Sequence, residues 1–446
     1  MHPAVSKDDQ KHLLSETASE LNMTNVLRTI IATLFLTSFF CFPSLAVAEG
    51  DKKPLRVYIL VGQSNMVGTG AISTIDYIGE DPATAPLLKS MLGDDGQPKT
   101  CERVWISSLN GKYRTEGEVG TGKLSPGYGR RTNPTQHGDC IGPEYTFGIT
   151  MEQDYDGPTL IIKTAWGGKS LHVEYRPPSA GEFVLSKEQI EKFRQKGVLA
   201  EKQAELEEQT GRYYRYMVKH VNSVLADLES VCPEYDETAG YELRGFVWFQ
   251  GWNDYVATAV YPLSDGNQQY APYGDLLCHF IRDVRKDLNA PELPFAIGVI
   301  GINGNHTAGT FNAAGSSQLR MERLREAMSA PSELPEFQGS VVAVPTAPFW
   351  DEELAVLDIK QRKIKQKRNQ ILKKSPNGPN ADGSMTKAEI QKFMDDYNNE
   401  IFSAEEMELK KRAMGGGGFV HYHGSAKFHA QAGEAFAKAL IGLHSK

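Results

Sequence analysis

The chain has 446 residues, of which 40% are hydrophobic and 23% are charged, and its formal net charge at pH 7 is −8. This composition is typical of a globular protein. The length exceeds what one minimal core requires, so one elaborated domain or two domains are both possible. The acidic balance argues against a nucleic-acid partner, because such a partner would require a basic face.

The first 48 residues have the pattern of a secretory signal peptide. Met23 and Arg28 precede an apolar run over residues 30–42, and a small-x-small motif closes the segment at Ala48. A basic start, a short apolar core and such an ending define this class of leader. We predict cleavage after Ala48, with Met23 as a possible true start. The mature chain would then be secreted or periplasmic, without stable membrane association. An uncleaved N-terminal anchor is the alternative.

Removing this leader leaves four cysteines, which are Cys101, Cys140, Cys232 and Cys278. Their wide spacing gives no zinc pattern, and no metal or other cofactor is predicted. Outside the cytoplasm four cysteines have three possible pairings into two disulfides. We expect a Cys101–Cys140 bridge, because both residues flank the same long loop.

The first predicted strand of the mature chain ends at a polar turn that contains a candidate nucleophile. Residues 57–61 are apolar, and Gly62-Gln63-Ser64-Asn65 follows directly. This position is the carboxyl end of a buried parallel strand, where open α/β sheets bind ligands. A following helix would favour an oxyanion beside Ser64, as an acyl-transfer nucleophile requires. The amides of Gln63 and Asn65 are candidate substrate contacts. The alternative is that Ser64 is an ordinary helix N-cap.

Two later strands end in similar turns. Residues 159–165 lead into Trp166-Gly167-Gly168, and residues 245–249 lead into Gln250-Gly251-Trp252-Asn253-Asp254. Glycines after a strand let the backbone approach a ligand closely, so the N–H of Gly168 is a candidate oxyanion donor. Three polar turns at one edge of a parallel sheet predict a single site, which favours the nucleophile interpretation of Ser64.

The rest of the chain alternates strands with helices, which predicts a parallel α/β sheet. Further strands are expected over residues 294–301 and 340–344, with helices near 144–151, 213–228, 273–287 and 318–328. Residues 110–140 are expected to form a long surface loop. Residues 176–212 and 360–412 are charged and helical in pattern. Residues 378–389 partly match the spacing of a calcium loop, but Gly378 supplies no side-chain oxygen, so a helix N-cap is preferred there.

Several short blocks resemble the SGNH hydrolases, in their sialate O-acetylesterase and acetylxylan esterase branch. The blocks, in order within residues 54–446, are Gly62-Gln63-Ser64-Asn65-Met66, Gly142-Pro143-Glu144, residues 163–168, residues 248–254 and residues 421–427. The resemblance implies an α/β fold for residues 49–446, a three-layer α/β/α sandwich with a central parallel sheet (SGNH, flavodoxin-like). Helical insertions would lie near 110–138, 176–212 and 360–412.

The resemblance also implies residue roles. Ser64 would be the nucleophile, and the oxyanion hole would consist of the N–H groups of Ser64 and Gly168 and the side chain of Gln250. The chain departs from the family block at Trp252, where glutamate is usual.

The chain departs from the family pattern a second time at the catalytic base. The family usually has Asp-x-x-His, but the residue three before His421 is Gly418, and the residue three before His423 is Val420. His423 is the preferred base, because it lies ten residues before Gly433, which is the family's spacing. His421 would then support the site or bind substrate.

The acid of the triad is left with two candidates. Asp351 is preferred because it leaves the sheet just before the histidine segment, and Asp254 beside Gln250 is the alternative. A backbone carbonyl or a water molecule could also orient the imidazole in place of a carboxylate.

The sequence therefore predicts a secreted carbohydrate O-acetylesterase with an acetylated carbohydrate as its partner. A non-catalytic carbohydrate-binding protein on the same fold is the alternative. The choice between a sialate and a xylan substrate and the oligomeric state stay open.

Overall fold

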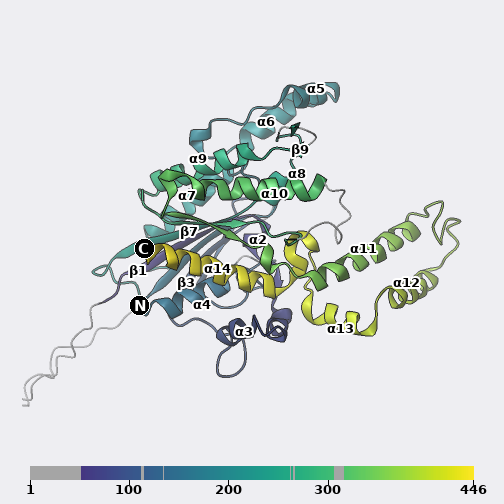
Figure 1. Ribbon diagram of the computed structural model, residues 1–446, viewed down its shortest axis with the longest axis horizontal. Coiled ribbons are helices and arrows are strands. Elements are labelled where there is room, and N and C mark those ends of the chain that lie inside the picture. The colour runs from purple at the N-terminus through teal and green to yellow at the C-terminus, as the bar shows by residue number, and fades with distance from the viewer. Residues whose placement is uncertain are drawn as a thin grey trace, which may run out of the picture. The chain divides into compact units, whose positions relative to one another are not determined.

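A seven-stranded sheet forms the centre of the described chain, and six of its strands are parallel (Figure 1). The computed structural model describes residues 52–111, 115–133, 135–261, 263–264, 267–305 and 316–445. The strand order is β11-β10-β7-β1-β6-β3-β4. The strands of this sheet are β1 (Leu55–Gly62), β3 (Val104–Asn110), β4 (Glu118–Lys123), β6 (Thr159–Ala165), β7 (Tyr241–Phe249), β10 (Phe295–Val299) and β11 (Val341–Pro345). Two short pairs lie outside it: β2 (Gly70–Ala71) with β5 (Cys140–Ile141), and β8 (Leu263–Ser264) with β9 (Asn267–Gln268).

Strand β1 lies at the point where the direction of strand addition reverses. With β3 and β4 set aside, the order β6-β1-β7-β10-β11 is the 2-1-3-4-5 order of a flavodoxin-like sheet. Such sheets bind ligands beyond the carboxyl end of the strand at the reversal. The predicted fold class is therefore confirmed, and its expected ligand position coincides with the turn after β1.

Helices cover both faces of this sheet (Figure 1). One face carries α7 (Arg212–Leu225), α9 (Ala271–Asp287) and α10 (Ser316–Ser329), and the other carries α4 (Glu144–Asp154) and α14 (Ala426–His444). The remaining α-helices are α2 (Ser64–Val67), α3 (Ala85–Met91), α5 (Lys187–Gln195), α6 (Leu199–Gln209), α8 (Trp252–Val256), α11 (Glu352–Leu372), α12 (Lys387–Ile401) and α13 (Ala404–Ala413). Short 3₁₀ segments are η1 (Ile72–Glu80), η2 (Pro178–Ala180), η3 (Ala330–Glu333), η4 (Pro335–Phe337), η5 (Ala347–Phe349) and η6 (Phe419–Gly424).

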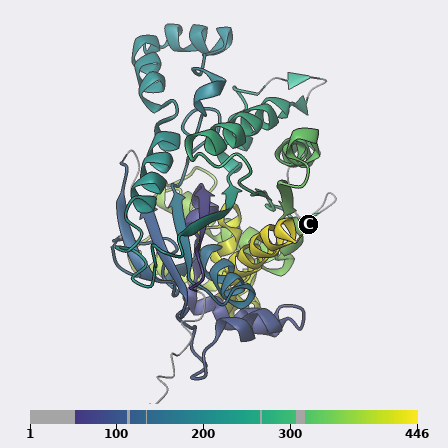
Figure 2. The same cartoon turned by 90° about the vertical axis from the view of Figure 1, so that its left-hand side faces the viewer.

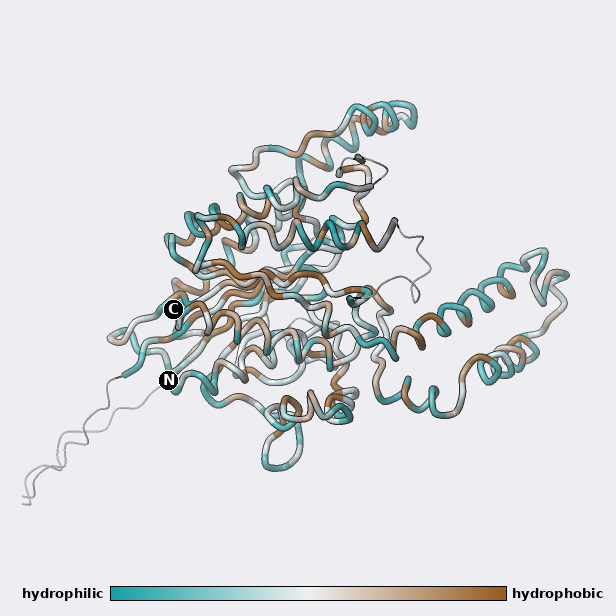
Figure 3. The backbone as a smooth tube through the Cα atoms, viewed as in Figure 1, coloured by the Kyte–Doolittle hydropathy of each residue, from teal (hydrophilic) through white to brown (hydrophobic). Residues whose placement is uncertain are grey.

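The hydrophobic core lies between these layers, where Figure 3 shows the most apolar chain in the central strands. Val57, Ile59, Leu60 and Val61 of β1 are fully buried. A parallel strand covered on both faces needs such a continuous apolar run, which explains why it was recognisable in the sequence. In the part of the chain that the structure describes, no helix is both long and apolar enough to cross a bilayer. The predicted signal peptide lies outside the described residues, so cleavage and export stay predictions.

The predicted insertions contain ordered elements. Part of the expected 110–140 loop is β4, which pairs antiparallel with β3 at the sheet edge. The 176–212 segment contains α5 and α6, which extend from the body beyond α7 in both views (Figures 1 and 2). The segment from α11 to α13 has its own small core, formed by residues that include Leu357, Ile364, Ile371, Met394, Phe402 and Leu409.

The expected Cys101–Cys140 disulfide is wrong, because the four cysteines of the described chain are free and buried. The thiol of Cys140 donates to the Asp139 carboxylate at 3.4 Å. Burial raises the pKa of the Cys140 thiol to about 11, so this thiol stays protonated at neutral pH.

A buried ion pair joins two of the sequence blocks and contacts the end of helix α2. Lys163 Nζ on β6 lies 2.6 Å from Glu144 Oε2 at the start of α4, and both side chains are almost completely buried. The same ammonium donates to the carbonyl oxygens of Val67 and Tyr128, each at 2.9 Å. Because Val67 ends α2, this pair fixes the segment that begins at Ser64.

Replacing Lys163 with methionine is expected to lower the free energy of unfolding by about 3–5 kcal/mol, because Glu144 would stay buried without its ion-pair partner. Urea unfolding of the purified chain measures this loss. Lys89 is exposed, and the control Lys89→Met should change stability by no more than about 0.5 kcal/mol. Equal stability of the two variants would contradict the assigned role of the pair.

Candidate active site

Three strands bring the predicted polar turns to one edge of the sheet. Gly62 of β1 pairs with Ala165 of β6 on one side and with Phe249 of β7 on the other. A side chain at position 62 would come within 2.1 Å of the Phe249 carbonyl oxygen, so only glycine fits this close approach. The turns after the three strands therefore lie together, as the sequence predicted.

Ser64 opens helix α2 at this edge and is half-buried. The residue at the N-cap position is Gln63, and its side chain makes no capping bond, so the N-cap interpretation of Ser64 is wrong. In the described chain, Ser64 Oγ accepts a hydrogen bond from Gln63 Nε2 at 3.5 Å. The serine hydroxyl is thus held only loosely by the protein.

The turn after β6 faces this serine. A Cβ at Gly167 would lie 3.8 Å from Ser64 Cβ. Apart from Gly168 and its two chain neighbours, no heavy atom of the described chain lies within 4 Å of where a Cβ at Gly168 would be. Both glycines are exposed, and Gly168 has a positive φ of 73°. Their backbone therefore borders open space beside Ser64, where an N–H group can meet a substrate oxygen.

The two glutamines of the site bind each other instead of facing this space. Gln63 Oε1 accepts hydrogen bonds from Gln250 Nε2 at 3.2 Å, Gly251 N at 3.1 Å and Asn253 N at 3.3 Å. Gln250 Nε2 also donates to Asp254 Oδ2 at 2.6 Å and to the Lys169 carbonyl at 3.0 Å. This arrangement argues against the oxyanion role expected for Gln250, because inner acceptors already use its amide hydrogens.

Asn65, the residue after Ser64, is buried. Its side chain is 3% exposed, and its Oδ1 atom has no hydrogen-bond partner in the described chain. Because this amide is buried, the structure does not support its predicted contact with substrate.

Asp254 is bound to a histidine that the sequence interpretation did not include. Its Oδ1 lies 2.9 Å from His172 Nδ1, and the backbone N–H groups of Leu171 and His172 donate to the same carboxylate at 2.8 and 3.2 Å. Tyr261 also donates to it. Burial raises the pKa of the Asp254 carboxyl, but the adjacent His172 and these donors outweigh that effect and lower it overall. The position of His172, shortly after the Gly167-Gly168 turn, was the available sequence signal.

Asp351 also forms its hydrogen bonds with groups other than the predicted bases. It caps α11, where Oδ1 accepts from Leu354 N at 3.0 Å, and its Oδ2 accepts from the Tyr77 hydroxyl at 3.0 Å. Among the described residues, the bonding partners of Asp254 and Asp351 include neither His421 nor His423.

The histidine segment forms a tight turn, η6. Tyr422 and His423 have positive φ angles of 49° and 62°. The His423 ring is 1% exposed and packs 4.8 Å from the Trp350 ring, and neither of its nitrogens is hydrogen-bonded in the described chain. Burial lowers the pKa of His423 to about 3. The preferred base thus lies inside the protein.

His421 lies in a different environment. Its ring is only partly buried, and its Nδ1 donates to the Gly417 carbonyl at 3.2 Å. Thr69 Oγ1, five residues after Ser64, donates to the His421 carbonyl at 3.3 Å. Burial lowers the pKa of His421, the Gly417 carbonyl opposes this effect, and the charge of Arg130 adds to it.

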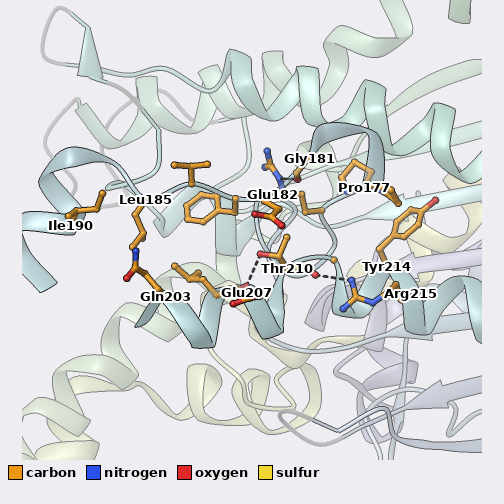
Figure 4. A pocket seen from close by; sticks show the side chains of 16 residues that line it. Pro177, Gly181, Glu182, Leu185, Ile190, Gln203, Glu207, Thr210, Tyr214 and Arg215 are labelled. Carbon is orange, nitrogen blue, oxygen red and sulfur yellow. Dashed lines mark hydrogen bonds between the residues drawn. The ribbon is translucent and has the colours of Figure 1, made fainter. Parts of the chain in front are cut away.

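A cavity of about 670 Å³ lies in the 176–212 insertion (Figure 4). Apolar residues line it together with charged and amide groups, and they include Phe183, Leu185, Ile190 and Leu206 with Glu182, Gln203, Glu207 and Arg215. The Phe183 ring lies 5.5 Å from the His172 ring, and Arg176 donates to the His172 carbonyl at 3.2 Å. The cavity is therefore connected to the bonded network that ends at Ser64.

Solved structures to which the chain is similar include three distant ones. A protein from Arabidopsis thaliana is 17% identical, with a TM-score of 0.35 over 66% of this chain and 86% of that protein. XAC1771, a carbohydrate acetylesterase from Xanthomonas citri, is 13% identical, with a TM-score of 0.36 over 65% of this chain and 49% of that one. NanS is 12% identical, with a TM-score of 0.34 over 66% of this chain and 78% of that one. At these TM-scores the likeness transfers neither residue roles nor substrates.

Comparisons with curated proteins and with protein families give different results. No curated protein matches the chain significantly. Residues 54–334, more than half of the chain, match the family described as "Carbohydrate esterase, sialic acid-specific acetylesterase". The matched span includes Ser64, Gly168 and Gln250, and it ends before both candidate bases. The chain therefore belongs to the carbohydrate esterase family of sialic acid-specific acetylesterases.

Proposed function

We propose that the chain is a serine esterase that hydrolyses O-acetyl groups on a carbohydrate. The observation that carries this proposal is the position of Ser64 at the carboxyl end of β1, half-buried and facing the exposed backbone of Gly167 and Gly168. Membership of a carbohydrate esterase family supports the substrate class. Sialate and xylan esters both remain candidates within that class.

The proposed reaction is a double displacement. Ser64 Oγ attacks the acetyl carbonyl carbon while its proton passes to a histidine, and the N–H groups of Ser64 and Gly168 donate to the oxyanion. The C–O bond to the sugar then breaks, and the sugar oxygen takes the proton from the histidine. Water attacks the acetyl-serine with the same histidine as base, which releases acetate and restores the hydroxyl.

The structure favours His421 over His423 as this base. A base must reach the hydroxyl proton, and His421 is only partly buried and bonded to the Ser64 side of the site through Thr69. His423 is enclosed beside Trp350. The carbonyl of Gly417 holds Nδ1–H of His421, so the unprotonated Nε2 is left to accept a proton. His421 therefore replaces His423 as the proposed base. A backbone carbonyl orients its ring, so this arrangement needs no carboxylate.

Release of acetate from a panel of O-acetylated sialosides and xylan fragments tests the proposal, with the native chain and Ser64→Ala compared at equal concentration. The native chain should release acetate from at least one substrate, and the variant should not. Equal release from both proteins would favour the non-catalytic carbohydrate-binding alternative.

The pH profile should carry the signature of His421. Its pKa lies below the ordinary value of 6.5, so the ring stays neutral and active as a base to lower pH than a free imidazole. The acid limb of kcat/KM is therefore expected below pH 6.5. Arg130→Gln should move this limb to higher pH, because it removes a positive charge that disfavours the imidazolium. An unmoved limb would contradict the assignment of His421 as the titrating base.

The insertion cavity is the proposed contact for the rest of the glycan. Phe183→Ala should raise KM for a polymeric acetylated glycan by roughly 10-fold, because aromatic contacts contribute on the order of 1 kcal/mol or more. A small activated acetyl ester is the control, and its KM should stay unchanged. A rise in KM for both substrates would place Phe183 at the reacting centre.

A further inference from the structure

We propose that Asp358 of helix α11 is a positioning residue, which holds the Gly418–Phe419 peptide and through it fixes the backbone of His421. The inference rests on the proposed function, with Ser64 and His421 as the reacting pair. Asp358 belongs to a segment that lies beyond the matched family span of residues 54–334.

The Gly418–Phe419 peptide organises the histidine turn. The carbonyl of Gly418 accepts hydrogen bonds from His421 N at 3.1 Å and from His423 N at 3.0 Å. The N–H on the other side of the same peptide, that of Phe419, donates to the Asp358 carboxylate. One carboxylate on α11 therefore anchors the peptide to which both histidine backbones are bonded.

The burial and the neighbours of Asp358 fit this positioning role. Its side chain is 4% exposed, although it is charged and lies on a helix whose surface is mostly basic. A Cβ at Gly418 would lie 3.7 Å from Asp358 Oδ1. Gly418 is three residues before His421, where the family pattern has its aspartate. The carboxylate from α11 thus lies beside the position from which that acidic side chain is missing.

A second set of contacts packs the histidine turn, η6, against the active-site edge of the sheet. Arg362 Nε lies 3.3 Å from Asp358 Oδ2, and its guanidinium lies over the Phe419 ring at 5.3 Å from the centroid. The Phe419 ring meets the Trp252 ring edge-on, with centroids 5.6 Å apart and an interplanar angle of 82°. Trp252 replaces the family's usual glutamate, so both departures from the family pattern meet at this cluster.

The contacts of Asp358 indicate a positioning role and not a catalytic one. The described partners of Asp358 are a backbone N–H and Arg362, whereas the His421 ring is bonded to the Gly417 carbonyl. Asp358 therefore acts on the location of the base and has no contact with the reacting atoms. A displacement of about 1 Å at a catalytic group can lower turnover on the order of 10²-fold.

The test compares Asp358→Ala and Asp358→Asn with the control Glu353→Ala, which removes an exposed carboxylate from the same helix. With a small activated acetyl ester, Asp358→Ala should lower kcat by roughly 10²-fold and leave KM within about twofold. Asp358→Asn should retain most of kcat, because its amide oxygen still accepts from Phe419 N–H. Glu353→Ala should match the native chain. An unchanged kcat in Asp358→Ala, or an equal loss in Asp358→Asn, would overturn the proposal.

Amide hydrogen exchange gives a readout that does not depend on activity. The Phe419 amide should exchange faster in Asp358→Ala than in the native chain and in Asp358→Asn, while amides of the central sheet keep their native rates. If the native chain shows no Ser64-dependent turnover, the proposed function fails and this exchange pattern alone decides the role of Asp358. Native exchange of the Phe419 amide in Asp358→Ala would overturn it.

Discussion

Ser64→Ala is expected to lower kcat for a carbohydrate acetyl ester by roughly 10⁴- to 10⁶-fold, because alanine lacks the hydroxyl that we propose as the nucleophile. The half-buried hydroxyl and the open backbone of Gly167 and Gly168 are the basis of this expectation. Acetate release under single-turnover conditions measures the loss. The variant should keep its urea-unfolding midpoint, since the Ser64 side chain caps no helix.

A double variant tests whether Ser64 and His421 act in the same step. Catalytic groups that act as a unit are strongly non-additive, so Ser64→Ala with His421→Asn should be no slower than Ser64→Ala alone. Additive losses would mean that the two residues act in separate steps. A Ser64→Ala variant with native turnover would remove the serine mechanism altogether.

The parallel sheet was predictable because its central strands contain continuous apolar runs. Residues 57–61, which end at Gly62, and residues 160–162 are buried, so their composition marks them as strands of a covered sheet. The convergence of the three polar turns followed from the same logic. Parallel neighbours end at one edge, and the register of Gly62 with Ala165 and Phe249 makes that edge common to all three.

Side-chain orientation within the site could not be predicted in the same way. Gln250 was expected to face an oxyanion, but it lies between Gln63, Lys169 and Asp254. The Asp254 carboxylate that Gln250 contacts is also bonded to His172, which the loop after β6 brings back onto it. Spacing along the chain does not encode such a return, because loop closure depends on long-range packing.

The histidine turn was the least predictable part for a related reason. Four glycines, residues 415–418, precede it, and three of them adopt positive φ angles. Such backbone has no periodic pattern to interpret. The family's histidine-to-glycine spacing led to His423, but left-handed backbone at Tyr422 and His423 turns that ring inward against Trp350.

The same substitution at both histidines separates the sequence preference from the structural one. His421→Asn is expected to lower kcat by roughly 10³- to 10⁴-fold, because asparagine cannot accept the Ser64 proton. His423→Asn should stay within about threefold of the native kcat, because the ring does not take part and asparagine tolerates the left-handed backbone at this position. Steady-state hydrolysis of an activated acetyl ester measures both variants, and added imidazole should partly restore His421→Asn alone. If His423→Asn is the inactive variant and His421→Asn is active, the enclosed ring must rotate out during turnover, and the helix-spacing argument for His423 is correct after all.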